Sequence, residues 1–171
     1  VWKKGLGLQN INDVRICHEG DLQVKNLKSI KQAYAWSPYF SEHLPFLNHI
    51  FSAGIERLLD FNMAILRHLT LYMGVDTEIR LLSELNISTR GEALLVEICR
   101  FFKASAYLAP AGAGNYLDSR RFEKCGVELA FHKPKPCVYP QLWGDFLPDL
   151  SAFDLVFNCG PKAREVMFAI R

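Results

Sequence analysis

A glycine-containing stretch carries residue types that suit a hydroxyl-rich or anionic ligand. Residues 107–118 read Tyr-Leu-Ala-Pro-Ala-Gly-Ala-Gly-Asn-Tyr-Leu-Asp. Glycines let backbone N–H groups approach a phosphate or a sugar closely, while an amide donates and accepts hydrogen bonds and a carboxylate accepts them. The candidate ligand-binding residues here are Gly112, Gly114, Asn115, Tyr116 and Asp118. The alternative is that the two glycines only allow a tight turn, because a G-x-G pair without a third glycine is a weak motif.

A second candidate pair follows another predicted strand. Residues 78–82 have the pattern of a strand, and Ser83 and Glu84 come directly after it. In a parallel sheet, ligands tend to bind at the carboxyl ends of the strands. Ser83 and Glu84 are therefore candidate ligand-binding residues; the alternative is a plain transition from strand to loop.

The segments before residues 107–118 predict where this loop lies. Thr89 and Glu92 have the spacing of a capping box, which would begin a helix. One face of that helix would carry Leu94, Leu95, Ile98, Phe101 and Phe102. Residues 105–109 then form a short, largely apolar run that ends at Pro110. A helix, a buried strand and a glycine-containing loop in this order are typical of a parallel α/β sheet.

The whole pattern predicts one α/β domain that covers residues 1–171. The expected strands are residues 12–18, 78–82, 105–109 and 127–131. The expected helices are residues 25–34, 42–53, 55–73, 93–103, 119–124 and 162–170, with a further helical segment capped by Ser151 and Asp154. We expect a mainly parallel sheet of about four or five strands flanked by helices. Residues 132–140 contain three prolines and should form an extended surface or edge segment.

The cysteines, histidines and lysines do not form a recognisable site. The five cysteines are widely scattered without a C-x-x-C pair, so no zinc site is expected and all five should be reduced. Cys99 and Cys159 lie in apolar surroundings and should be small buried hydrophobes. We expect exposed or core-edge histidines at positions 43, 49 and 68. Lys25, Lys28 and Lys31 predict a solvated helix face; the alternative is phosphate binding.

The composition narrows the class of protein. The chain has 171 residues, a net charge of +2, 50% hydrophobic residues and 22% charged residues, which is ordinary for a globular protein. This charge gives no electrostatic basis for binding nucleic acid. We expect no membrane span, because no apolar run is long enough, and the first residues contain no apolar signal region. The odd number of cysteines, without the spacing of a disulfide framework, indicates a reducing compartment, so we expect a cytoplasmic location.

Several motifs in the second half belong together. Tyr107-Leu108 and Asn115-Tyr116-Leu117-Asp118 are followed by Phe122-(x)3-Gly126-Val127-Glu128 and by Tyr139-Pro140-Gln141. The run from Phe146 to Gly160 has the form F-x-P-x-L-S-x-x-D-x-x-F-N-x-G and is fairly specific. On these residues the chain resembles the WbqC-like protein family of bacteria over nearly its whole length. Its first half fits more loosely, through the aromatic and proline break at residues 35–40 and through Ser83-Glu84-Leu85.

The resemblance implies a role in the synthesis of surface polysaccharides. Genes of the family are commonly associated with O-antigen and other surface polysaccharides, and no general reaction is attached to it. Members share an N-terminal His-Gln-Pro-x-Tyr-Leu-Pro segment, and we expect this chain to begin just after that segment. The segment is similar to the nucleotide-binding turn of nucleotidylyltransferase-like folds, which implies a Rossmann-like arrangement. After Tyr107-Leu108, members often have Ser-Gly where this chain has Ala109-Pro110-Ala111-Gly112.

We therefore expect a transferase-type enzyme that acts on a nucleotide-activated sugar or an acyl donor. Tyr139 and Gln141 join the candidate ligand-binding residues, because they could line the same cleft as residues 112–118. The sequence indicates neither the catalytic residues nor a cofactor. The alternative function is a non-catalytic binding or assembly subunit of the same pathway, which would keep the scaffold without the N-terminal segment.

Overall fold

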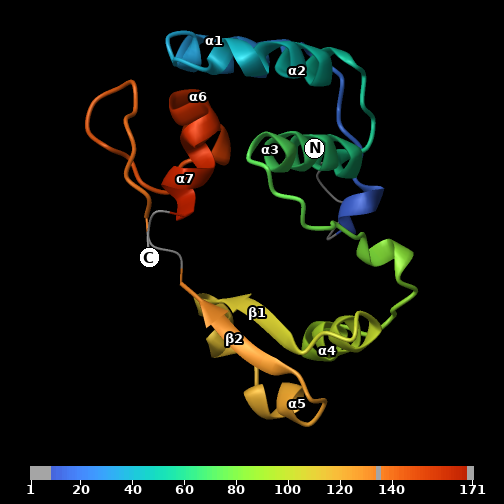
Figure 1. Cartoon of the computed structure of the whole chain (residues 1–171). Coiled ribbons are helices and arrows are strands. Elements are labelled where there is room, and N and C mark those ends of the chain that lie inside the picture. Colours follow the sequence, from blue (N-terminus) through green and yellow to red (C-terminus); the bar gives the residue numbers. More distant parts are fainter. Residues whose placement is uncertain (1–8, 134–135, 169–171) are drawn as a thin grey trace. The chain divides into compact units, whose positions relative to one another are not determined.

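The computed structural model describes residues 9–133 and 136–168. The chain forms two compact units (Figure 1). The helical unit consists of Val1–Asp76 together with Pro136–Arg171, and the sheet unit consists of Thr77–Lys135. The described chain is thus a mixed helix-and-sheet protein, and the single domain expected from the sequence stays a prediction.

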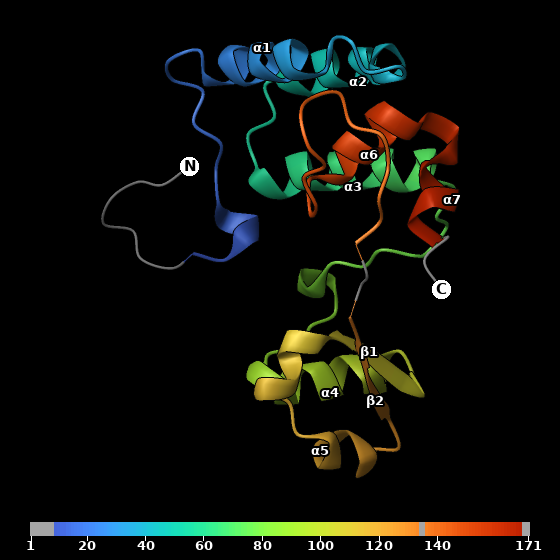
Figure 2. The ribbon, with the colours of Figure 1, turned by 90° about the vertical axis from the view of Figure 1, so that its left-hand side faces the viewer.

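The helical unit contains α1 (Leu22–Tyr34), α2 (Phe40–Ser52), α3 (Leu58–Tyr72), α6 (Ala152–Cys159) and α7 (Ala163–Phe168). Figures 1 and 2 show α1 and α2 side by side, and α6 packs against α2. Short 3-10 turns precede α1 at Ile11–Asp13 and join α6 to α7 at Gly160–Lys162. The expected helices in this unit are confirmed with ends shifted by one to three residues; the end of the last one lies outside the described residues.

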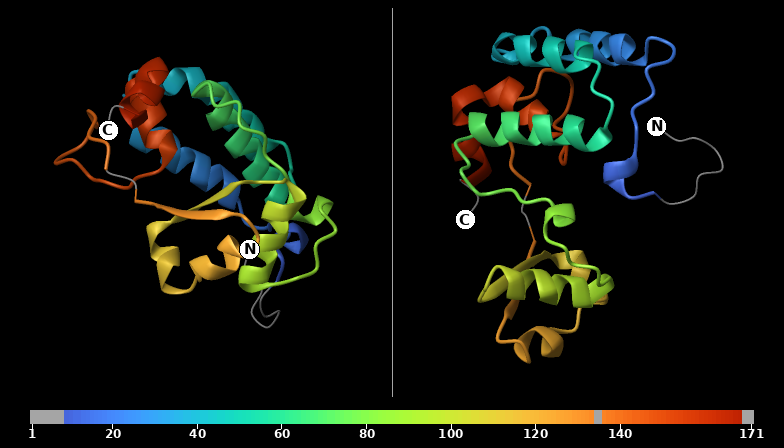
Figure 3. Two further views of the ribbon diagram at one scale, coloured as in Figure 1. Left: turned by 60° about the horizontal axis from the view of Figure 1, so that its bottom comes forward. Right: turned by 90° about the vertical axis from the view of Figure 1, so that its right-hand side faces the viewer.

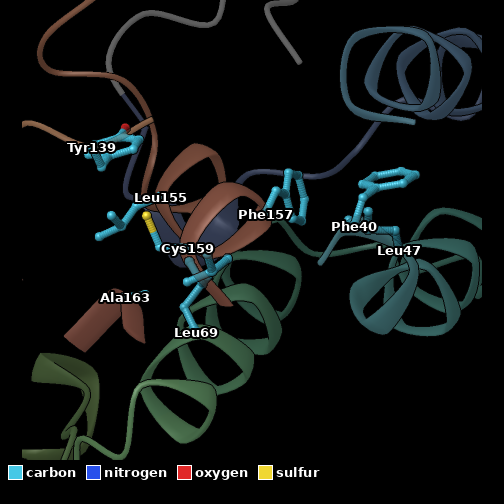
Figure 4. Packing of buried hydrophobic residues seen from close by; sticks show 9 residues of the cluster. Phe40, Leu47, Leu69, Tyr139, Leu155, Phe157, Cys159 and Ala163 are labelled. Atoms are coloured by element: carbon cyan, nitrogen blue, oxygen red, sulfur yellow. The ribbon is translucent and has the colours of Figure 1, made fainter. Parts of the chain in front are cut away.

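The core of the helical unit forms around α6, which is apolar on nearly all sides. Its buried members are Phe40, Leu47, Leu69, Tyr139, Leu155, Val156, Phe157, Cys159 and Ala163. Figure 4 shows Phe157 turned toward Phe40, with Leu155 and Cys159 between Tyr139 and Leu69. The Phe157 ring meets the rings of Tyr34 and Phe40 edge to face at 5.0 and 5.1 Å, a favourable aromatic geometry. Ser151 caps α6 by accepting a hydrogen bond from the Phe153 N–H, as expected.

The sheet unit holds α4 (Gly91–Phe101), β1 (Ala106–Pro110), α5 (Ser119–Glu123) and β2 (Glu128–His132). The two strands pair in parallel, with Ala106 opposite Glu128 and Pro110 opposite His132 (Figure 3). Their shared core contains Val96, Cys99, Ala109, Ala113, Leu117, Phe122 and Val127. Asp118 caps α5 by accepting a hydrogen bond from the Arg120 N–H at 3.0 Å; the sequence leaves Asp118 and Ser119 as alternative caps of this helix. The predicted strands at residues 105–109 and 127–131 are therefore confirmed, each one residue later.

The other two predicted strands are wrong. Residues 12–18 instead contain a 3-10 turn and one isolated antiparallel bridge from Arg15 to Arg57. The alternation in the sequence corresponds to burial, since Val14 and Ile16 are half-buried while Asp13 and Arg15 are exposed. Such alternation shows that one face of the segment is buried, but it does not require hydrogen bonding to a neighbouring strand. Among the described residues the sheet has two strands, so the sheet of about four or five strands is not confirmed.

The strand expected at residues 78–82 is an irregular segment followed by a 3-10 turn at Leu82–Glu84. Ile79 and Leu82 are both exposed, so the apolar side chains that suggested a buried strand are not in a core. In the segment at residues 132–140, Pro134 and Lys135 lie outside the described residues. The rest forms no strand beyond His132, and Tyr139 is buried in the core of the helical unit rather than at the surface.

The capping box predicted at Thr89 and Glu92 is also wrong. The residue that precedes α4 is Arg90, and its side chain makes no capping hydrogen bond. Thr89 Oγ1 donates to Glu97 Oε2 at 2.7 Å instead. The Glu92 carboxylate accepts a hydrogen bond from the Asp118 N–H at 2.6 Å and pairs with Arg121 at 3.0 Å. A tertiary contact has therefore taken the carboxylate that the local motif would have used.

A similar shift places Pro45 inside α2. The helix begins at Phe40, two residues earlier than expected, so Pro45 is its sixth residue rather than a first-turn residue. Gly74 follows the end of α3, and its φ of +62° is a left-handed conformation that favours glycine. The Arg164 guanidinium donates a hydrogen bond to the Gly74 carbonyl and ties this helix end to α7.

Candidate functional site

The candidate loop in the sheet unit begins where β1 ends. A 3-10 turn covers Ala111–Asn115, and we name residues 111–118 the strand-end loop. Because Pro110 pairs with His132 in the parallel register, the last residue of β2 lies at the same edge of the sheet. His132 is exposed. The carboxyl ends of both strands therefore place this loop and an imidazole together, an arrangement that the sequence reasoning missed because it did not pair the two strands.

The glycines of the strand-end loop are not required by the turn itself. Neither Gly112 nor Gly114 has a positive φ. A Cβ atom at Gly112 would meet nothing within 4 Å, and one at Gly114 would lie 3.7 Å from the Phe131 ring, an ordinary contact. The backbone at Gly112 is therefore open to a molecule that approaches it closely, and the tight turn alone does not explain the two glycines.

The polar residues of the strand-end loop differ in whether their side chains are already used in hydrogen bonds of the fold. Asn115 and Tyr116 are exposed, and within the described part of the chain no hydrogen bond holds the Asn115 side chain. Tyr116 is 71% exposed, which leaves its ring free to stack on a ligand. Asp118 is used by the fold, because its carboxylate caps α5 and its N–H donates to Glu92. Asn115 and Tyr116 thus remain the side chains of this loop that are open to a ligand.

Ser83 and Glu84 lie elsewhere in the sheet unit. Both are exposed in the 3-10 turn at Leu82–Glu84, and the Glu84 carboxylate accepts a hydrogen bond from the Leu81 N–H at 3.4 Å. No strand precedes them, so the structural reason for choosing them, a place at the carboxyl end of a strand, is absent. Their ligand-binding role stays a prediction.

Tyr139 and Gln141 belong to the helical unit, where both contact Asp154. The Tyr139 hydroxyl donates to Asp154 Oδ2 at 2.8 Å, and the Gln141 amide donates to the same oxygen at 3.2 Å. Gln141 also bonds both backbone groups of Leu147: its amide donates to the carbonyl at 2.9 Å, and its oxygen accepts from the N–H at 2.8 Å. We name Tyr139, Gln141 and Asp154 the buried acid network. That Tyr139 and Gln141 share a cleft with the strand-end loop stays a prediction.

Asp154 is the centre of the buried acid network. It is only 4% exposed, and its partners are the neutral donors Tyr139 and Gln141. Burial first, and then the negative charge of Asp154, raise the pKa of Tyr34 to about 12. Burial also raises the pKa of Tyr139, and its hydrogen bond to Asp154 adds to this. The two phenols therefore remain protonated at neutral pH, and Tyr139 acts as a hydrogen-bond donor to the acid.

Comparison with known proteins identifies the family of the chain. The model of the WbqC-like protein family matches residues 1–166, which include the strand-end loop and the buried acid network. The chain belongs to this family. An uncharacterized protein of Mycobacterium tuberculosis (strain ATCC 25618 / H37Rv) is 25% identical over 142 residues, which cover 82% of this chain and 62% of that protein. The chain thus spans less than two thirds of this relative, and no solved structure gives a significant match.

This WbqC-like protein also contains a histidine pair, His43 and His68, that sequence reasoning missed. His43 is 0% exposed, and its Nδ1 lies 2.9 Å from Nε2 of His68, so one ring donates a hydrogen bond to the other. His43 Nε2 has no partner among the described residues. Burial first, and then His68, lower the pKa of His43 to about 4, and burial lowers the pKa of His68.

The expected exposed or core-edge position is therefore wrong for His43, whereas His68 is half-buried and His49 is exposed. The missed signal is the helical spacing of Phe40, His43, Leu47 and Ile50, all of which are buried. The described residues of this WbqC-like protein include no group of three or more His, Cys, Asp or Glu side chains able to hold a metal ion. None of the helices in residues 9–133 and 136–168 has the length and apolar character needed to cross a membrane.

Proposed function

We propose that this WbqC-like protein is a transferase-type enzyme that acts on a nucleotide-activated sugar or an acyl donor in the synthesis of O-antigen or another surface polysaccharide. The observation that carries the proposal is the strand-end loop. It follows a parallel strand, has open space over its backbone at Gly112, and leaves Asn115 and Tyr116 exposed; His132 ends the neighbouring strand at the same sheet edge. The carboxyl ends of parallel strands are the usual place for such ligands.

Each residue of this edge has a proposed role. The backbone around Gly112 and Gly114 approaches the phosphate or sugar of the donor. Asn115 donates and accepts hydrogen bonds with sugar hydroxyls, and Tyr116 stacks on a flat group of the ligand. His132 is the proposed general base, because an imidazole nitrogen can accept a proton and this ring is exposed at the same edge.

Calorimetric titration with nucleoside diphosphate sugars and with acetyl-coenzyme A tests the proposal. We expect one class of donor to bind, and Asn115→Ala to weaken its binding about tenfold, as expected for the loss of a good hydrogen bond. Gly112→Val should weaken binding similarly, because its side chain fills the open space above the loop. Glu123→Ala is the matched control, since Glu123 is an exposed residue of the neighbouring helix α5.

The variant His132→Gln distinguishes the proposed enzyme from the alternative function, a non-catalytic binding or assembly subunit. In the enzyme, this substitution should leave donor binding nearly unchanged and abolish most transfer or hydrolysis of the donor. Donor binding without any turnover in the wild-type protein would favour the binding subunit. The proposal fails if no donor of either class binds, or if Asn115→Ala and Gly112→Val bind the donor as tightly as the wild type.

A further inference from the structure

Two indole rings stand exposed at one end of α1 in the helical unit. Trp36 follows the helix and is 79% exposed, and Trp143 is 62% exposed. The Trp143 Nε1–H donates a hydrogen bond to the Ala33 carbonyl in the last turn of α1, at 3.0 Å. Figure 2 shows the segment that leads into α6 rising to α1 and α2. Since Ala33 is three residues before Trp36, both tryptophans lie at the same end of α1, and we name them the indole platform.

The Trp143 ring is held in place although it is exposed. Gln141 braces the segment that carries it, through two hydrogen bonds to the Leu147 backbone and one to Asp154. The indole N–H is already used by Ala33, so the ring offers a ligand only its face and its carbon edge. A ring that is fixed before binding loses little conformational entropy when a ligand stacks on it.

The charges around the indole platform disfavour an anionic ligand. The charged residues of positions 141–150 are Asp145 and Asp149, and both are exposed. At this end of α1, Gln32 is exposed and Lys31 is half-buried. Asp145 and Asp149 offset the charges of Lys31 and of Lys28, which is exposed on the same face of α1 as Gln32, so no net positive charge attracts a phosphate group or an anionic lipid surface. Asp145 and Gln32 instead offer the acceptors and donors that match the hydroxyl groups of an uncharged polyol.

We propose that the indole platform binds a neutral oligosaccharide, with the C–H face of one sugar ring on Trp143 and a neighbouring ring on Trp36. Asp145 accepts hydrogen bonds from sugar hydroxyls, and Gln32 donates and accepts them. Identification of this oligosaccharide as the acceptor of the transferase rests on the proposed function. The binding itself rests only on the geometry of the two indoles and the polar groups beside them.

Nuclear magnetic resonance of the tryptophan side chains tests the binding. The probes are glucose, galactose, rhamnose, N-acetylglucosamine, maltohexaose and chitohexaose. We expect at least one of them to shift the indole signals of Trp36 and Trp143. Trp143→Ala and Trp36→Ala should each weaken binding of that sugar about tenfold, the scale of one aromatic contact. Leu71→Ala is the control, because Leu71 is 82% exposed on α3 and should not affect binding.

Three results would overturn the inference. The first is that none of the sugars shifts the two indoles. The second is that acrylamide fails to quench their fluorescence, which would show that the rings are covered. The third is that vesicles of phosphatidylglycerol bind the wild-type protein and lose this binding in the tryptophan variants, while the sugars do not bind. If Trp143→Ala does not fold, Trp36→Ala and Trp143→Phe decide instead, because phenylalanine keeps a ring but loses the hydrogen bond to Ala33.

The two proposals fail separately. The sugar titration involves residues of the helical unit, and the donor titration involves the strand-end loop of the sheet unit. If the protein binds an oligosaccharide but no donor, the indole platform is supported and the proposed transferase function is contradicted. If the protein binds a donor, Trp143→Ala does not change that binding and no sugar binds, the transferase function is supported and the indole platform is contradicted.

Discussion

The helical unit and the sheet unit contain polar groups that the fold uses to very different degrees. In the helical unit, the Asp154 carboxylate is buried and accepts hydrogen bonds from Tyr139 and Gln141. In the strand-end loop of the sheet unit, the Asn115 side chain is exposed and has no hydrogen-bond partner within the described residues. Residue type alone would favour the aspartate as the functional group. Burial and partners favour the opposite assignment, with Asp154 as a structural residue and Asn115 as a residue open to a ligand.

Among the substitutions that test this contrast, Asp154→Ala should change the stability of the protein most. It removes the acceptor of the buried Tyr139 hydroxyl and of the half-buried Gln141 amide, so we expect the free energy of unfolding to fall by about 3 kcal/mol in urea denaturation. Asp145→Ala is the matched control, because this exposed acid of the segment before α6 should change stability by less than about 0.5 kcal/mol. If Asp154→Ala is as stable as the wild type but loses transferase activity, the buried acid network is itself the active site and the comparison is reversed.

Lowering the pH should weaken the helical unit through the histidine pair. The pKa of His43 is lowered from 6.5 to about 4 in the folded state, so the unfolded chain binds more protons between these values. The stability from the neutral pair is fully present above pH 6.5 and is lost as the pH falls toward 4, by about 3 kcal/mol. The lowered pKa of His68 acts in the same direction, whereas the nearby charge of Glu42 raises the pKa of His43 and so acts against it. Urea denaturation as a function of pH measures this loss.

His43→Gln should flatten this pH dependence, because the buried titrating group is gone. His49→Gln is the control on the same helix, since His49 is exposed and should leave the curve unchanged. An unchanged curve for His43→Gln would show that other groups cause the acid sensitivity.

Glu92→Ala should have an intermediate effect in the sheet unit. Glu92 holds the end of the strand-end loop through the Asp118 N–H and also pairs with Arg121. We expect a loss of about 1 kcal/mol in stability, and weaker donor binding because the loop is less well positioned. Glu123→Ala, on exposed α5, should change neither quantity. Full donor binding by Glu92→Ala would show that the loop does not depend on this anchor.

Asn115→Ala should have the smallest effect on folding. Its exposed side chain makes no hydrogen bond within residues 9–133 and 136–168, so we expect a change of less than about 0.5 kcal/mol in thermal unfolding. The same variant should bind the donor about tenfold more weakly, as proposed above. A large loss of stability would show that the fold already uses Asn115, and the contrast between the two units would disappear.

The sequence by itself determined the features that depend on neighbours along the chain. The helices, the two strands at residues 106–110 and 128–132, and the caps at Asp118 and Ser151 follow from spacings of two to four residues, which local geometry dictates. The same local signals failed where a distant residue competed for a group. Glu92 is the clearest case, because it bonds Asp118 rather than completing a capping box with Thr89.

Only the tertiary structure decided which polar groups are used up and which stay open. His43 and His68 are 25 residues apart, and Tyr139 and Asp154 are 15 apart, so no local pattern predicts either hydrogen bond. The pairing of β1 with β2, which brings His132 beside the strand-end loop, and the Trp143 contact with Ala33 are likewise long-range. The physical reason is that burial and hydrogen-bond partners depend on how elements pack, whereas periodicity records only which side of each element is apolar.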